Sequence, residues 1–82
     1  MIPETSYREM KNVCNMIMNR VVRISIPHYK DTSKMTAVFG KVESAEVIEY
    51  PKFNDVGVYV RLLNHLEAYF ISHDCLDDIS IL

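Results

Sequence analysis

The sequence predicts an α+β fold, with an amphipathic N-terminal helix at about residues 6–19 and a small, strongly bent antiparallel sheet or barrel of about five strands at about residues 20–82. Two periodicities predict it. From Tyr7 to Val21, apolar side chains recur every three or four residues, as they do along one side of a helix. From Arg20 onward they recur at every second residue, as they do in strands. The helix is therefore expected to lead almost directly into the sheet.

The chain is expected to form one domain over residues 1–82. A core of this size cannot be divided and still offset the entropy that is lost on folding. Apolar residues make up 49% of the chain and include nine valines and eight isoleucines, a composition typical of globular proteins. No internal repeat or linker indicates a boundary inside the chain.

The helix carries a start signal and an unusual number of methionines. Ser6 followed by Glu9 has the spacing of a capping box, which predicts that the helix starts near Ser6. Met16 and Met18 lie on the flanks of the apolar stripe and, together with Met10, widen the apolar surface. Methionine surfaces adapt easily to partners, although ordinary core packing is an equally good explanation.

The strands are predicted from alternation and its interruptions. Val22, Ile24 and Ile26 alternate until Pro27, and the polar segment 27–35 is expected to be a loop. Residues 36–50 are too long for one flat strand, and both Gly40 and a slip of the alternation near Ser44 predict a bulge or bend. The clearest strand is residues 56–63. A two-residue turn at residues 64–65, a returning strand, a helical turn at residues 73–78 and a short last strand follow.

This order of elements resembles that of the SH3-like small barrels, such as SH3 and Tudor domains, over residues 20–82. The resemblance concerns element order alone. The 27–35 loop contains Tyr29 and Asp31 but lacks a Trp and the usual acidic cluster of SH3 domains. The resemblance therefore implies a fold, and it transfers no ligand and no site residue.

No motif predicts a catalytic site, a metal site or a cofactor site. The densest polar cluster, HDCLDD at residues 73–78, places its ligands side by side, whereas tetrahedral zinc needs converging side chains. Cys14 lies on the apolar helix stripe, which predicts a buried and unreactive thiol. With only two glycines, the chain has no glycine-rich loop for a phosphate or an oxyanion. We expect no enzyme and no bound cofactor.

The net charge of −2 conceals an asymmetry between the two halves of the chain. Residues 1–42 hold seven basic and three acidic side chains, a charge of +4, and residues 43–82 hold two basic and eight acidic ones, a charge of −6. The favoured interpretation is that the halves complement each other within the fold or between subunits. In the alternative, the basic half binds nucleic acid, although the pI of 5.8 is low for that role. A minor alternative is that the acidic half mimics nucleic acid. The basic candidates are Arg20, Arg23, Lys30, Lys34 and Lys41.

The favoured function is that of a non-catalytic protein-binding module, acting as an adaptor, a subunit or a stoichiometric inhibitor. We expect it to form at least a homodimer through the helix face or an edge of the sheet. A cytoplasmic location is expected, because the chain has only two cysteines, interpreted as free thiols, and no apolar run long enough to span a membrane. The candidate partner-binding residues are Tyr7, Met10, Met16, Met18, Tyr29, Glu46, Glu49 and Tyr59.

Overall fold

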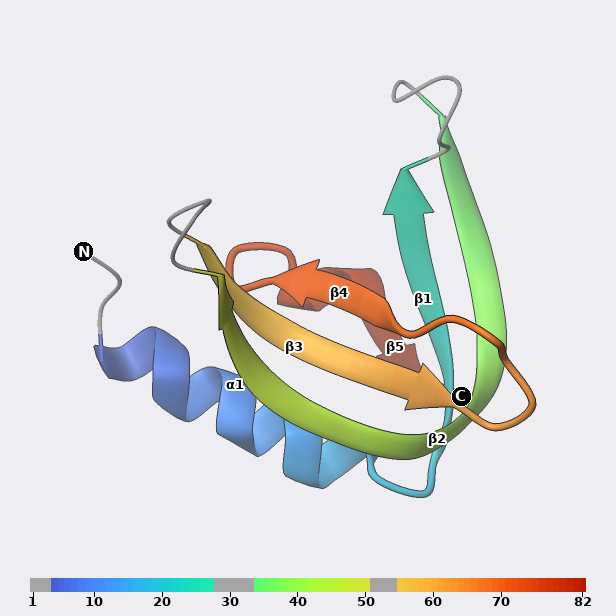
Figure 1. The fold of residues 1–82 in the computed structure, drawn as a ribbon, viewed down its shortest axis with the longest axis horizontal. Coiled ribbons are helices and arrows are strands. Elements are labelled where there is room, and N and C mark those ends of the chain that lie inside the picture. The colour runs from blue at the N-terminus through green and yellow to red at the C-terminus, as the bar shows by residue number, and fades with distance from the viewer. Residues whose placement is uncertain (1–3, 28–33, 51–54) are drawn as a thin grey trace.

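A computed structural model describes residues 4–27, 34–50 and 55–82, and it confirms the α+β fold of one helix and a five-stranded antiparallel sheet (Figure 1). Helix α1 comes first in the chain and the strands follow. The elements are α1 (Glu4–Ile17), β1 (Val21–Pro27), β2 (Met35–Tyr50), β3 (Asp55–Leu62), β4 (Tyr69–Ser72), the 3-10 turn η2 (Leu76–Asp78) and β5 (Ile79–Ile81). Most of the predicted 27–35 loop lies outside the described residues, as do residues 51–54 before β3.

Strand β2 organises the sheet. Its 16 residues are too many for one partner, so residues 35–41 pair with β1 and residues 42–50 pair with β3. Figure 1 shows β2 curving from beside β1 to beside β3. The strand order is β4-β3-β2-β1-β5, with β4 and β5 at the two ends, so the sheet is strongly bent but not closed into a barrel. The barrel closure that the SH3-like resemblance implies is therefore absent.

The bend coincides with a break in strand register. The pairing of β2 with β3 shifts between Val42 and Ser44, which confirms the slip predicted near Ser44. The bulge is not at Gly40, because Gly40 pairs with Val22 in unbroken register. The extra residue in β2 is Glu43, which is exposed. Before it, the side chains directed toward the core belong to even-numbered residues, such as Val42, and after it they belong to odd-numbered residues.

Helix α1 starts and ends about two residues earlier than predicted. It begins at Glu4, so Ser6 lies in its first turn and does not precede it. At the other end, Asn19 adopts a left-handed conformation with φ of 62°, and the Arg20 N–H donates to the Ile17 carbonyl at 2.9 Å. A left-handed residue directly after a helix stops it and reverses the chain. β1 can then begin at Val21.

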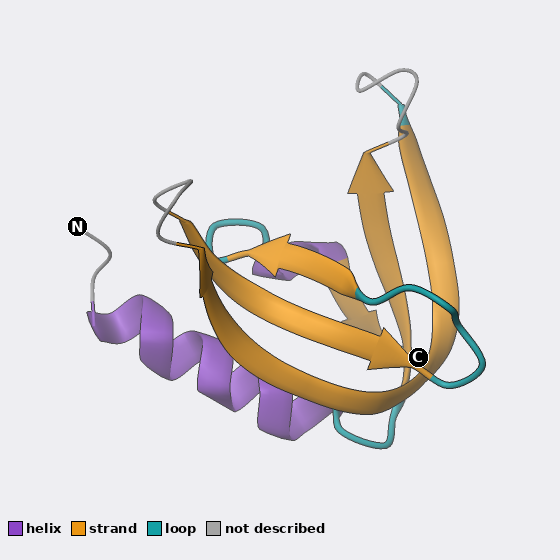
Figure 2. Ribbon diagram, in the orientation of Figure 1, coloured by secondary structure: helices purple, strands orange, loops and turns teal. Residues whose placement is uncertain are grey.

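The core lies between α1 and the bent sheet. Met10, Cys14 and Ile17 are the buried residues of α1, which runs alongside β2 and β3 (Figure 2). The sheet contributes Val22, Ile24, Val42, Val56, Val58, Val60, Leu62 and Ile71. Burying one such side chain contributes roughly 1.5–3 kcal/mol, so this cluster supplies much of the driving force for folding.

The connection between β3 and β4 differs from the predicted two-residue turn. It spans residues 63–68, and β4 starts only at Tyr69. A tight turn does form, with the His65 N–H donating to the Leu62 carbonyl at 3.1 Å and with Asn64 at φ of 66°. Without a glycine beside Asn64, the chain does not return directly into a strand, and Leu66 is left 99% exposed. The predicted helical turn at residues 73–78 is confirmed as η2.

Candidate functional site

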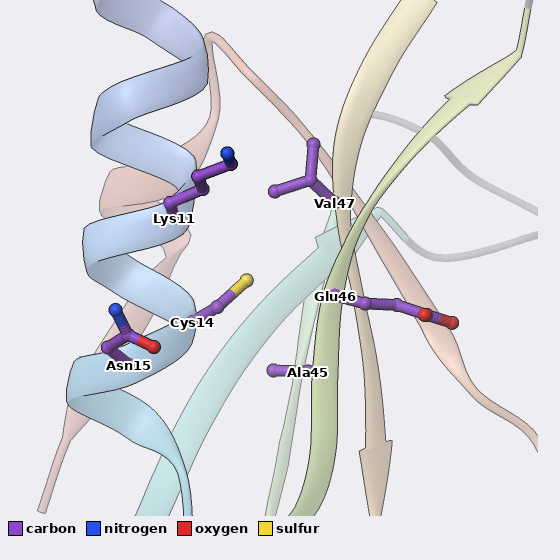
Figure 3. A pocket seen from close by; sticks show the side chains of 6 residues that line it. All are labelled: Lys11, Cys14, Asn15, Ala45, Glu46 and Val47. Atoms are coloured by element: carbon purple, nitrogen blue, oxygen red, sulfur yellow. The ribbon is translucent and has the colours of Figure 1, made fainter.

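The principal candidate site is a groove between α1 and the second half of β2. It has a volume of about 340 Å³. Figure 3 shows the Cys14 sulfur directed toward β2, the Ala45 and Val47 side chains directed toward α1, and Glu46 directed away from the helix. The groove is lined by Lys11, Cys14, Asn15, Ala45, Glu46 and Val47. It therefore has a partly apolar floor and a polar rim.

The Cys14 thiol lies in the floor of this groove. Its pKa is raised, mainly because burial disfavours the thiolate and also because of the negative charge of Glu46. A protonated, buried thiol is a poor nucleophile. Cys14 thus contributes apolar surface to the groove, in agreement with its position on the apolar stripe of the helix.

A hydrogen bond fixes the helix beside the far end of β2. The Tyr7 hydroxyl donates to Oε1 of Glu49 at 2.7 Å, which raises the pKa of Tyr7. Two candidate residues that are 42 positions apart in the sequence are thereby in contact. A smaller cavity of about 250 Å³ adjoins this contact and is lined by Glu4, Tyr7, Arg8 and Lys11. Lys11 lines both cavities.

The remaining partner-binding candidates lie on different surfaces. Met16 is 62% exposed and Met18 36% exposed, whereas Met10 is fully buried and offers no surface to a partner. Glu46 and Tyr59 are directly opposite each other on β2 and β3, so both lie on the face turned away from α1. Tyr29 lies outside the described residues.

The basic candidates are partly brought together. Arg23 is opposite Phe39, and Lys41 lies two residues further along β2, so all three share one face. Phe39 is 55% exposed, so its ring is accessible beside the two basic side chains. Arg20 and Lys34 are exposed as well, and Lys30 lies outside the described residues.

The sequence predicted a binding surface at an edge of the sheet, and the strand order identifies the edge strands as β4 and β5. β4 has the sequence YFIS and β5 the sequence ISI, so neither edge carries a charged residue or a proline. Natural proteins commonly protect sheet edges with these residues. The strands were predicted from alternation, but their edge positions depend on the strand order, which alternation does not determine.

Near β4, polar side chains bond to one another. The Asp55 carboxylate accepts from the Ser72 hydroxyl at 2.9 Å and from the Val56 N–H at 2.8 Å. The Cys75 thiol donates to Asp74 at 3.4 Å, and both cysteines are free. Within residues 4–27, 34–50 and 55–82, no three His, Cys, Asp or Glu side chains are arranged to hold a metal ion.

Comparisons with protein-family models, curated proteins and solved structures gave no match to this chain. In the part of the chain that the structure describes, no helix is long and apolar enough to cross a membrane.

Proposed function

We propose that this protein is a non-catalytic protein-binding module that binds strands at the edges of its sheet and self-associates there. The observation that carries the proposal is the absence of charge and proline from both edge strands, β4 and β5. An unprotected edge presents backbone donors and acceptors to any strand that approaches it.

The alternation of hydrogen bonds identifies the available backbone groups of β5. The Leu82 N–H donates to the Val21 carbonyl at 3.0 Å, so Leu82 and Ser80 face β1. The backbone groups of Ile79 and Ile81 consequently face outward. Ile81 is 38% exposed and Leu82 is 67% exposed, so apolar area accompanies the open edge.

The β4 edge has matching properties. The His73 N–H donates to the Val56 carbonyl at 2.9 Å, so the backbone groups of His73 face β3. Because the backbone groups of successive residues in a strand alternate between its two sides, those of Ile71 also face β3, and those of Phe70 and Ser72 face outward. Leu63 and Leu66, in the connection that leads into β4, are 50% and 99% exposed. Because the two edges differ in sequence, a β4-to-β5 contact between copies is heterologous, and such contacts close into rings or extend into filaments.

Light scattering of two variants at the same position tests this proposal. Ile81→Pro removes an outward N–H without removing a bond to β1, and we expect it to reduce the particle mass toward that of the single chain. Ile81→Ala keeps the N–H and should still associate. Circular dichroism shows whether both variants fold. A mass of 9.5 kDa for the unmodified chain at every concentration would refute the proposal.

The SH3-like resemblance concerns the fold alone. We propose that the chain is an open variant of that element order, in which β4 and β5 do not pair with each other. In such a variant, the two strands that would complete a barrel remain available to other chains.

A second candidate function, the binding of single-stranded nucleic acid, is favoured by one surface. Arg23 and Lys41 flank the exposed ring of Phe39 on one face of the sheet, an arrangement suited to phosphate contacts and base stacking. Salt-sensitive, submicromolar binding of a fluorescent oligonucleotide, lost in Phe39→Ser and kept in Met16→Ser, would support it. We expect no such binding, because the chain as a whole is acidic.

A further inference from the structure

Beyond β4 and β5, the sheet has a third open edge, along the second half of β2. Residues 44–49 of β2 pair with β3, whereas β1 pairs with residues 35–41. The chain leading into β1 bonds to Val42: the Val42 N–H donates to the Arg20 carbonyl at 2.9 Å, and the Val42 carbonyl accepts from the Asn19 N–H at 3.1 Å. Between Glu43 and Glu49, no backbone bond to another described residue is found on this side of β2.

The direction of the backbone groups on this edge follows from alternation. The carbonyl of Val56 accepts from β4, so the next residue, Gly57, faces β2, and so does Tyr59. Their partners on β2 are Ile48 and Glu46, which therefore bond to β3.

The residues of β2 between these bonded positions face the opposite way. The N–H and C=O groups of Ala45, Val47 and Glu49 are directed away from β3, toward the open side. Ala45 and Val47 also line the groove beside α1 (Figure 3). The groove thus provides space beside strand groups that can accept a further strand.

The groove and the adjoining cavity together have a suitable length for a short strand. The α1 residues that line the two cavities include Glu4, Arg8, Lys11 and Asn15, which lie three or four residues apart on one side of the helix. These positions span about 16 Å at a rise of about 1.5 Å per residue. A five-residue strand, at about 3.3 Å per residue, covers the same distance.

We propose that this groove binds an extended segment of a partner protein, which adds as a strand to residues 45–49 of β2 alongside α1. Side chains of an added strand alternate between the two faces of the sheet. The side chains on the α1 side meet Lys11, the charged residue of α1 that lines the groove beside Ala45 and Val47, which favours an acidic residue there. Those on the other face lie beside Glu46, which favours basic residues. The segment is therefore one in which acidic and basic residues alternate.

This site uses neither β4 nor β5, so it goes beyond the self-association proposed above and can be tested separately. The probe is a labelled heptapeptide in which lysine occupies the odd positions, glutamate positions two and six, and valine position four. Its control is the peptide with lysine and glutamate exchanged. We expect fluorescence anisotropy to show about tenfold tighter binding of the probe, the effect of one or two favourable charge pairs.

Variants of two exposed lysines separate the groove from general electrostatics. Lys11→Glu should abolish the preference for the probe, while Lys34→Glu makes the same change of charge outside the groove and should keep it. Ile81→Pro should bind the probe as the unmodified chain does. Equal effects of the two lysine variants, or equal affinities for the two peptides, would overturn the proposal.

Amide hydrogen exchange tests the strand itself. Bound probe should slow the exchange of the amides of Ala45, Val47 and Glu49, while those of Glu46 and Ile48, already bonded to β3, should change little. Protection of Ile79 and Ile81 instead would place the peptide on the β5 edge and would overturn the proposal.

Discussion

Gly57 lies at a position of the sheet that has no room for a side chain. A Cβ atom there would overlap the carbonyl oxygen of Ile71 and would lie 2.7 Å from the ring of Phe70. We predict that Gly57→Ala lowers the free energy of unfolding by roughly 1–3 kcal/mol, the usual cost of overpacking, as measured by urea denaturation.

The matched control is Gly40→Ala. The atoms nearest to its Cβ would be side-chain atoms of Leu62 and His65, at 3.2 to 3.3 Å, and these can move slightly. A loss of stability in Gly40→Ala as large as that in Gly57→Ala would contradict the prediction.

The exposed thiol of Cys75 is held in its protonated form by its surroundings. Its pKa is raised by partial burial and then by the hydrogen bond to Asp74 and that residue's charge. Thiol reagents attack the thiolate, so a raised pKa slows the reaction near pH 8. We predict that Asp74→Asn lowers the pKa and increases the rate at which Cys75 reacts with a disulfide reagent.

The difference should disappear well above the pKa, where the thiolate predominates in both proteins. Cys75→Ser should remove the fast phase and leave only the slow reaction of buried Cys14. An unchanged rate in Asp74→Asn at pH 8 would show that burial alone controls this thiol.

At the scale of elements, the junction between α1 and β1 depends on the conformation of Asn19. Its φ of 62° lies in the left-handed region, which costs a β-branched residue about 1–2 kcal/mol. We predict that Asn19→Val destabilises the protein by this amount in thermal or urea unfolding. Asn19→Gly should be tolerated, and equal stability of the two variants would argue against a conformational origin.

Elements with strong local periodicity were predictable from the sequence. The stripe through Met10, Cys14 and Ile17 and the alternation of Val56, Val58 and Val60 both correspond to buried side chains. The prediction of a two-residue connection between β3 and β4 was wrong. Asn64 fits a tight turn, but the path of the chain after the turn depends on tertiary contacts, such as that between His65 Nδ1 and the Tyr69 hydroxyl, which are 2.8 Å apart.

The candidate site was less predictable, because it depends on which elements meet. No pattern in the sequence pairs Tyr7 with Glu49, and their contact follows from helix α1 running alongside β2. Met10 was a candidate for a partner surface, but the periodicity that places it on the apolar stripe places it in the core equally well. Neither the open side of β2 nor the edge strands could be identified without the strand order.

At the scale of the whole molecule, self-association should make stability depend on concentration. A partner that binds only the folded chain stabilises it, and a second copy is such a partner. We predict that the Tm of the unmodified chain rises with protein concentration, as measured by differential scanning calorimetry. The Tm of Ile81→Pro should stay constant, and a rise of equal size in this variant would place the contact elsewhere.

The bulge after Val42 falls at the point where the charge of the chain changes from +4 in residues 1–42 to −6 in residues 43–82. A backbone cut there would yield two pieces that each retain part of the sheet and expose part of the core, so neither would fold alone. Mixed together, the oppositely charged pieces should attract each other and reconstitute the fold, at a rate that decreases as salt screens the attraction. We therefore expect the two pieces to complement each other as the halves of a split protein do.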